Sequence, residues 1–270
     1  MIIGKAISPF ALRKKSSGGG GGNDPDAQLF ITATGISGTN ATATNQLVLD
    51  LKSANIWTKM KAIYPMVGGT ATTCKFNLKD ARDLDASYRL VFSGGGTFSA
   101  NGYQPGGVNG YANTFFNPSA ITNNNHLSYY SRTNVAEDKI DIGAQAFSGQ
   151  SFSTAFRAIG NTYNAGNHLM ASFISTANTS SLGLAINTRT TSSNFKVYIN
   201  GILKDTNTNT GLGPISENIY LGARNNVGTA ALFASKQCAF ASIGDGLTDA
   251  EALAFYNAVN AFQVSLARNV

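Results

Sequence analysis

From about residue 60 onward, the chain consists of short runs rich in β-branched and aromatic residues, separated by turn-forming residues. The clearest pair of runs flanks Asn200-Gly201, and Asn-Gly is the preferred dipeptide of a two-residue type I′ hairpin turn. Many short strands with turns between them predict an all-β sandwich or barrel. Strands are predicted at 60–66, 74–78, 88–92, 126–131, 139–142, 153–159, 168–175, 182–188, 194–199, 202–205, 218–222 and 237–243.

The composition agrees with this prediction. Charged residues make up only 13% of the 270 residues, against about 25% in an average soluble domain. The chain has 29 glycines and is rich in Asn, Thr and Ser, so we expect a polar but largely uncharged surface. Helical bundles and coiled coils need Glu, Lys, Arg and Leu in quantity and are therefore excluded. The length fits one β-sandwich with small additions.

A small helical pair is predicted at 24–58, ahead of a β-sandwich at 59–270. Asp24 followed by Pro25 is typical of a helix N-terminus, and Gly35 is typical of a helix end. A second helix is predicted over about 41–54, where apolar residues recur on one face.

A further helix is predicted near the end of the chain. Thr248 and Glu251 have the spacing of a capping box, and apolar residues at helical spacing follow them. The two cysteines, Cys74 and Cys238, both lie in apolar, strand-like surroundings. We interpret them as buried thiols and keep a disulfide as the alternative, because disulfide scaffolds use cysteine far more densely.

The first fifteen residues form an apolar and basic peptide, and a glycine-rich linker at 16–23 separates it from the rest. Much of the formal net charge of +6 lies in this peptide, and the body is nearly neutral. Its charges mostly follow the apolar residues, so it does not have the pattern of a signal peptide. We expect the peptide to bury its side chains on a partner. The predicted anchoring residues are Ile2, Ile3, Ile7, Phe10, Leu12, Arg13, Lys14 and Lys15.

Two classes of partner are not expected. No stretch of about 18 apolar residues exists, so we predict no membrane span. Basic residues do not cluster in the body, and so nucleic acid is not an expected partner.

Three motifs in the C-terminal part of the chain occur in an order that is found in a known fold family. They are the hairpin Tyr-Ile-Asn-Gly at 198–201, Ile-Tyr-Leu-Gly-Ala at 219–223, and the segment at 239–256 that leads into the closing helix. In this order they are similar to the C-terminal half of concanavalin A-like (laminin-G-like) jelly rolls. The resemblance covers about residues 125–262 and implies a mainly β jelly-roll sandwich with a possible role in carbohydrate binding.

A second resemblance concerns three segments nearer the N-terminus, at 26–36, 56–69 and 75–83. They look like segments of tailed-phage structural proteins in which two small helices precede a jelly roll. This resemblance implies a virion protein that is a head fibre, spike or tail appendage. In such a protein, residues 1–15 would attach the chain to a capsid or tail protein, and homo-oligomerisation would be expected.

Because the jelly-roll superfamily includes glycoside hydrolases, catalytic carboxylates have to be considered. Retaining hydrolases hold two carboxyl groups about 5–5.5 Å apart. The chain has three glutamates, at 137, 217 and 251. The cluster from Glu137 to Asp141 lacks the hydrolase motif, and we interpret it as a turn that leads into a strand. We therefore expect no enzyme activity, and a glycoside hydrolase is the least favoured alternative.

Metal and nucleophile motifs are equally weak. His126 and His168 each precede Leu and are predicted to open strands. Asp80, Asp83 and Asp85 alternate with basic residues, so we interpret them as ion-paired loop carboxylates and keep a calcium site as the alternative. No Cys/His cluster is present. We expect no catalytic residue, no metal and no cofactor.

The segment 93–125 is predicted to be a long loop rich in Gly and Asn. Long loops in compact domains are often functional or contact other subunits. Aromatic rings with neighbouring amides suit both a neutral sugar and a subunit interface, and ordinary loop packing is the third alternative. The candidate contact residues are Tyr103, Asn109, Tyr111, Asn113, Phe115 and Phe116.

The function predicted from the sequence is that of a phage virion structural protein. Its N-terminal arm would anchor it, and its lectin-like domain would bind a host surface glycan. A capsid decoration protein that binds no glycan is the alternative.

Overall fold

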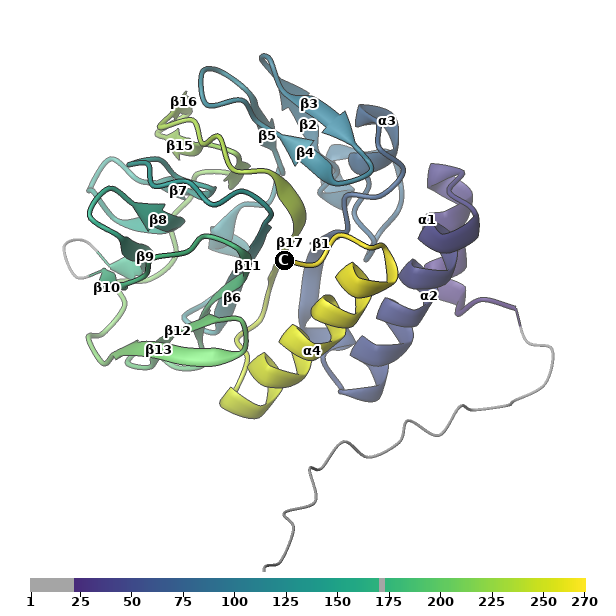
Figure 1. The fold of residues 1–270 in the computed structure, drawn as a ribbon. Helices are drawn as coiled ribbons and strands as arrows, with labels where there is room; N and C mark the ends of the chain where they lie inside the picture. Colours follow the sequence, from purple (N-terminus) through teal and green to yellow (C-terminus); the bar gives the residue numbers. More distant parts are fainter. Residues whose placement is uncertain (1–21, 170–172) are drawn as a thin grey trace, which may run out of the picture.

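The computed structural model describes residues 22–169 and 173–270, and Figure 1 shows their arrangement. The predicted anchoring peptide, 1–15, lies outside the described residues together with most of the linker. The attachment role of that peptide stays a prediction. The body that follows is a β-sandwich with helices on one side.

One sheet is covered by helices, and we call it the covered sheet. Its strand order is β13-β12-β11-β6-β17-β4-β3, with β1 paired to β17. Its strands are β1 (Met60–Tyr64), β3 (Thr97–Ser99), β4 (Gly102–Gln104), β6 (Asn125–Ser131), β11 (Gly183–Arg189), β12 (Phe195–Ile199), β13 (Ile202–Asn207) and β17 (Cys238–Gly244).

The second sheet carries the candidate site, and we call it the open sheet. Its strand order is β10-β9-β8-β7-β14-β5-β2, with β15 parallel to β7 and paired to β16. Its strands are β2 (Val91–Ser93), β5 (Tyr111–Asn113), β7 (Ile142–Gln145), β8 (Ser151–Ala158), β9 (Thr162–Leu169), β10 (Ile174–Ala177), β14 (Tyr220–Leu221), β15 (Arg224–Asn226) and β16 (Thr229–Ala231).

The inner faces of the two sheets form the main hydrophobic core. Strand β8 shows how the alternation of side chains divides the sheet. Phe152 and Phe156 belong to the core, whereas Ser151, Ser153 and Ala155 line a hollow on the opposite face. One strand therefore supplies both the core and the outer surface.

A second core lies between the covered sheet and the helices α1 (Pro25–Thr34), α2 (Gly38–Ser53) and α4 (Asp249–Ser265). Leu47 of α2 and Phe255 of α4 are buried there with Phe240 of β17. Helices α2 and α4 lie side by side along this face (Figure 1). The central strands of the covered sheet are therefore buried on both faces, whereas its edge strand β13 is largely exposed. The helical pair shares a core with the sandwich.

The predicted helix ends are largely confirmed. The Asp24 side chain accepts a hydrogen bond from the Asp26 N–H, Pro25 opens α1, and Gly35 ends it in the left-handed region at φ 69°. At the other end of the chain, Thr248 and Glu251 form the capping box of α4. These local signals hold because the partners of a helix terminus are sequence neighbours.

The predicted hairpin is also confirmed. Strands β12 and β13 pair in antiparallel fashion, and Asn200 and Gly201 between them have φ values of 51° and 76°. Positive φ at both central positions is what a type I′ turn requires. Mainly-β jelly-roll architecture with N-terminal and C-terminal helices is thus present as predicted.

Three predicted segments were wrong. Residues 74–78 do not form a strand, because a short helix α3 (Ala71–Cys74) ends there. The segment 93–125 is not one long loop but contains β3, β4 and β5. The strand predicted at 168–175 is divided between the end of β9 and the start of β10.

Single-turn helices of the 3-10 type lie at η1 (Trp57–Lys59), η2 (Asp85–Ser87) and η3 (Pro118–Ala120).

The error at 168–175 has a physical reason. Strand β9 contains Asn and Gly residues that argue against a strand in isolation. A Cβ at Gly166 would lie 1.9 Å from Ser151 Oγ on the neighbouring strand, so a larger residue here would require the Ser151 hydroxyl to move. Packing against β8 therefore overrides the local preference of the sequence.

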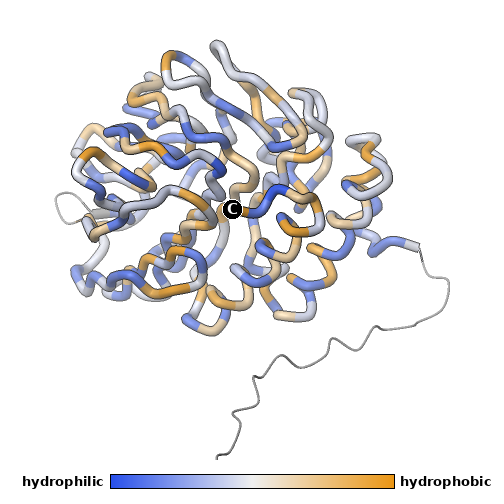
Figure 2. Tube along the Cα trace, viewed as in Figure 1, coloured by the Kyte–Doolittle hydropathy of each residue, from blue (hydrophilic) through white to orange (hydrophobic). Residues whose placement is uncertain are grey.

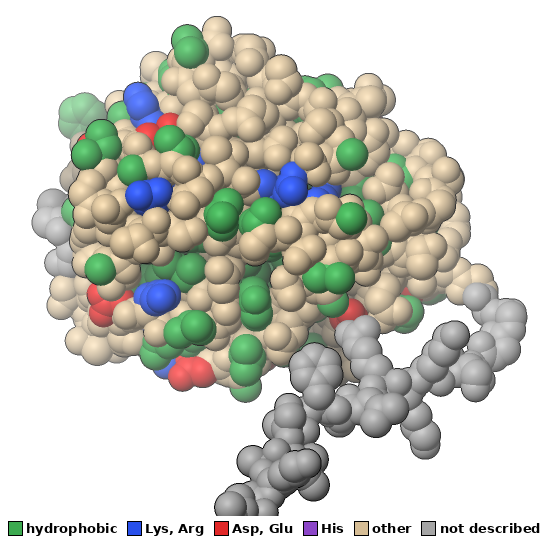
Figure 3. All heavy atoms as spheres, viewed as in Figure 1, with side chains coloured by type: hydrophobic (Ala, Val, Ile, Leu, Met, Phe, Trp, Pro, Cys, Tyr) green, Lys and Arg blue, Asp and Glu red, His purple; other side chains and the backbone are tan. Residues whose placement is uncertain are grey.

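Other features of the body agree with the sequence. Cys74 and Cys238 are free and buried, so the interpretation as thiols is confirmed. Hydrophobic and hydrophilic residues alternate over short stretches along the described chain (Figure 2). Charged side chains occupy a small part of the face seen in Figure 3. Among the described helices, none combines the length and apolar character of a membrane span.

Candidate ligand-binding site

The outer face of the open sheet is hollowed over strands β7, β8 and β9. The hollow has a volume of about 340 Å³, which lies in the range typical of small-ligand sites, roughly 300–1,000 Å³. Within the described residues, α1, α2 and α4 cover the other sheet (Figure 1). We call this feature the open-sheet hollow.

Small side chains form its floor. Ser151, Ser153 and Ala155 of β8 lie beside Asn164 and Gly166 of β9. The absence of large side chains from these five positions creates the hollow. Their hydroxyl and amide groups can both donate and accept hydrogen bonds to a ligand.

Two polar atoms of the hollow lack partners. Arg224 comes from β15, and its Nε is buried without a hydrogen-bond partner, as is Oδ1 of Asn164. Burial lowers the pKa of Arg224 from its usual value. Buried polar groups in proteins nearly always have a partner. An unpaired donor and an unpaired acceptor in one hollow are therefore positions for the polar groups of a ligand.

Apolar groups complete the lining. Ile140, Leu232 and Phe173 contribute to it, and Phe173 remains 54% exposed. Phe147, in the connection between β7 and β8, is 93% exposed but does not belong to the lining. Aromatic faces beside amides, hydroxyls and a guanidinium form the combination that binds sugars, whose C–H faces stack while their hydroxyls hydrogen-bond.

The carboxylates of the hollow do not form a hydrolase pair. Among the described residues, Asp138 is the one carboxylate in the lining, and its Oδ1 accepts a hydrogen bond from the Ile159 N–H at 2.9 Å. Glycoside hydrolysis requires two carboxyl groups that flank the scissile bond. The geometry of the hollow therefore suits binding.

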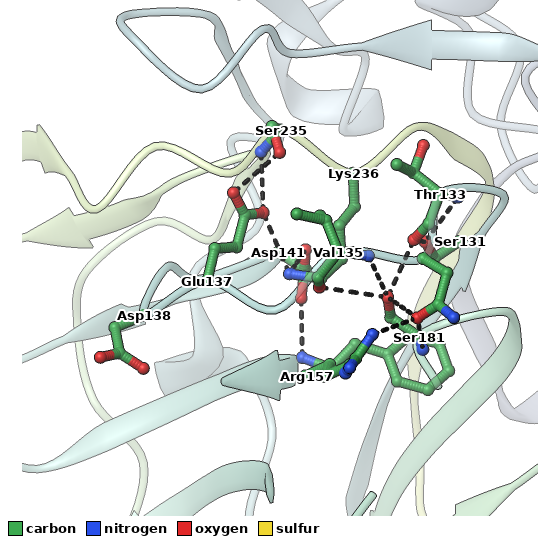
Figure 4. A network of polar contacts seen from close by, with 12 residues as sticks. Ser131, Thr133, Val135, Glu137, Asp138, Asp141, Arg157, Ser181, Ser235 and Lys236 are labelled. Carbon is green, nitrogen blue, oxygen red and sulfur yellow. Dashed lines mark hydrogen bonds and ion pairs between the residues drawn. The ribbon is translucent and has the colours of Figure 1, made fainter. Parts of the chain in front are cut away.

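Glu137 and Asp141 lie next to the hollow but point into a buried ion cluster (Figure 4). Their partner is Lys236, whose side chain is 0% exposed. The sequence alone indicated a turn here, and it gave no sign of Lys236, which is far away along the chain.

Two of the six candidate contact residues lie in the hydrophobic core. Tyr103 is 0% exposed and stacks on Phe98 at 5.1 Å between ring centroids, and Phe116 is 1% exposed and contacts Tyr88 edge-on at 4.9 Å. Neither is open to a glycan or another subunit, so both are corrected to core residues.

The other four residues are at least partly exposed but have local structural roles. The ring of Tyr111 stacks on that of Tyr220 at 4.8 Å. Asn113 Oδ1 accepts a hydrogen bond from the Phe115 N–H, and Asn109 Oδ1 accepts one from the Gly95 N–H. None of the four lines the open-sheet hollow. Their role in glycan or subunit contact stays a prediction.

The remaining polar candidates have structural partners. The loop carboxylates are ion-paired as predicted, with Asp80 bound to Arg82, Asp83 to both Lys75 and Arg89, and Asp85 to Arg89. In the described ranges, no group of three or more His, Cys, Asp and Glu side chains is placed to hold a metal ion.

The histidines are buried strand residues. His126 lies in β6, and its ring nitrogens contact Asp245 O at 2.7 Å and Ser242 Oγ at 2.9 Å. His168 lies near the end of β9 and not at the start of a strand, which corrects the prediction. Burial lowers the pKa of each to about 4.

Sequence reasoning missed the residues of the hollow. One signal was available in β8, Ser-Phe-Ser-Thr-Ala-Phe-Arg-Ala, where small residues alternate with larger ones. A strand with one large face and one small face indicates a sheet that is packed on one side and hollowed on the other. Arg224 gave no comparable signal, because it reaches the hollow only through the parallel pairing of β15 with β7.

Comparison with solved structures supports the fold. The chain is similar to domain 4 of AbnA, a GH43 extracellular arabinanase from Geobacillus stearothermophilus solved in complex with arabinotriose. The TM-score is 0.50 at 13% identity, and the match covers 73% of this chain and 98% of that chain. No protein-family model and no curated protein matches the sequence.

A second similar structure is that of botulinum neurotoxin type C, whose cell entry depends on interaction with two ganglioside molecules. The TM-score is 0.49 at 15% identity, covering 77% of this chain and 53% of that one, so the chain spans about half of that structure. The arabinanase domain carries the structural comparison. At 13% identity the similarity concerns the fold alone, which is a β-sandwich of two sheets.

Proposed function

We propose that the chain is a virion appendage protein whose open-sheet hollow binds a glycan on the host surface. The observation that carries the glycan-binding part is the pair of unpartnered buried atoms, Arg224 Nε and Asn164 Oδ1, in a hollow of sugar-binding size. The exposed ring of Phe173 supports it, because a sugar ring would stack there. The hollow binds without cleaving, and the chain is not an enzyme.

The virion part of the proposal rests on the sequence. Residues 1–15 attach the chain to a capsid or tail protein, and the glycine-rich segment 16–23 holds them apart from the body. Several copies of the chain assemble in the appendage. The tailed-phage resemblance of three segments near the N-terminus supports this location.

A glycan array probed with the full chain tests the binding site. We expect Arg224→Gln to weaken binding to the recognised glycan at least about tenfold, because a charge-assisted hydrogen bond contributes roughly 1.5–3 kcal/mol. Arg82→Gln is the matched control. The Arg82 side chain is 67% exposed and does not line the hollow, so this variant should leave binding unchanged.

Two results would oppose the proposal. If the folded wild-type chain binds no glycan on a broad array, the body is better explained as a decoration module. If Arg224→Gln binds as tightly as the wild type, the glycan occupies another surface.

A further inference from the structure

The buried ion cluster beside the hollow has an arrangement that goes beyond a structural salt bridge. Lys236 Nζ lies 3.0 Å from Glu137 Oε1 and 3.4 Å from Asp141 Oδ1. The side chains of Lys236 and Asp141 are both 0% exposed, and that of Glu137 is 15% exposed. Figure 4 shows the lysine between the two carboxylates. One amine and two carboxyl groups thus meet inside the protein.

The two carboxyl groups have different surroundings. Glu137 is held by Ser235, whose N–H donates to Oε1 at 2.9 Å and whose hydroxyl donates to Oε2 at 2.8 Å. These bonds, together with Lys236, lower the pKa of Glu137 although its burial acts in the opposite direction. Glu137 is therefore a fixed carboxylate that can accept a proton from the lysine.

Asp141 differs from Glu137 in its pKa and in its hydrogen bonds. Burial raises its pKa above the usual value, in spite of the neighbouring Lys236. Its Oδ2 accepts a hydrogen bond from the Phe156 N–H at 2.7 Å, whereas its Oδ1 has no hydrogen-bond partner and faces the lysine. The Phe156 N–H stabilises negative charge on Oδ2. Oδ1 has no such bond and could serve as the leaving group in a reaction at Cγ.

The other cation nearby does not neutralise the cluster. The guanidinium of Arg157 is bound to Asn134 Oδ1 at 2.8 Å and to Asn161 Oδ1 at 2.7 and 3.0 Å. Two carboxyl groups therefore share one buried ammonium. Such a group of charges is costly to desolvate, and conversion of one pair to a neutral amide removes that cost.

We propose that Lys236 and Asp141 join in an intramolecular isopeptide bond, with Glu137 as the proton carrier. The ammonium first gives one proton to Oδ1 of Asp141, which leaves a neutral amine and a carboxylic acid. The lone pair of Nζ then attacks Cγ, and the electron pair of the carbonyl moves to Oδ2, where the Phe156 N–H stabilises it.

Glu137 completes the reaction. It takes a second proton from Nζ and delivers it to the Oδ1 hydroxyl, the C–O bond breaks, and one water leaves as the carbonyl re-forms. The products are an amide between Nζ and Cγ, one water and a regenerated Glu137 carboxylate. No oxidant, reductant or further reactant is required. Close approach within the fold replaces the activation that amide formation needs in solution.

The proposed isopeptide bond would connect segments that belong to the two different sheets. Asp141 comes directly before β7 of the open sheet, and Lys236 lies shortly before β17 of the covered sheet. The amide therefore joins the two sheets covalently at the edge of the open-sheet hollow. An appendage exposed outside a cell gains resistance to heat, force and proteases from such a cross-link.

The intact mass of the folded full chain tests the proposal. We expect the wild type to be lighter than its sequence mass by one water, after allowance for loss of Met1. Proteolysis should give a branched peptide that joins the segments around Asp141 and Lys236. Lys236→Met, Asp141→Ala and Glu137→Gln should each show the full sequence mass.

Lys204→Met is the matched control, because Lys204 is an exposed lysine on β13, and this variant should keep the mass deficit. A wild-type chain with its full sequence mass would overturn the proposal, whether or not the variants fold. A water deficit without the branched peptide would also overturn it, because dehydration at another site would then explain the mass.

Discussion

His126 and His168 show how single buried residues connect the fold to solution conditions. Both side chains are 0% exposed, and both are held neutral, since burial lowers the pKa of each to about 4 from 6.5. Arg189 lowers the pKa of His168 further. Between pH 4 and pH 6.5, the unfolded chain therefore binds protons more readily than the folded chain.

The body should accordingly lose stability as the pH falls from about 6.5 to about 4. We expect a loss on the order of 2–3 kcal/mol for each histidine. The measurement is the free energy of unfolding from urea titrations across this range. The free energy of unfolding of His126→Asn should depend less steeply on pH than that of the wild type. The carboxyl groups contribute equally to both proteins, so the difference between the two slopes reports on His126 alone. Equal slopes would show that His126 does not titrate as proposed.

At the scale of elements, helix α4 depends on the covered sheet for its stability. Phe255 is 0% exposed and packs near Phe240, with 5.9 Å between ring centroids, whereas Leu253 on the same helix is 49% exposed. The two residues are two positions apart, so they face different surroundings on one helix.

Phe255→Ala should destabilise the body by about 3–5 kcal/mol, because it leaves a cavity between helix and sheet. Leu253→Ala is the matched control and should change the free energy of unfolding by less than about 0.5–1 kcal/mol. Thermal or urea unfolding of the two variants measures both. Equal losses would mean that α4 is not packed on the sheet through the face that carries Phe255.

The elements also show what the sequence could predict. The α4 capping box and the Asn200-Gly201 turn were predictable, because each depends on residues adjacent in the chain. The strand β9 was misplaced because its Asn and Gly residues do not favour a strand locally, and its pairing with β8 and β10 decides its structure. The open-sheet hollow was missed for the same reason, since its walls come from separate strands.

At the scale of the whole molecule, the proposed function is divided between two parts of the chain. The body, whose cores consist of described residues, holds the open-sheet hollow. We propose that residues 1–15 supply attachment through their apolar and basic side chains. Both cores can be traced within the described residues, and we therefore expect the two proposed functions to be separable.

The most direct test is the amount of chain recovered with purified phage particles, compared between the full chain and a chain that begins at residue 23. We expect the shortened chain to fold and to bind its glycan but to be missing from the particles. Equal recovery of both chains with the particles would contradict the division of function, because attachment would then lie in the body.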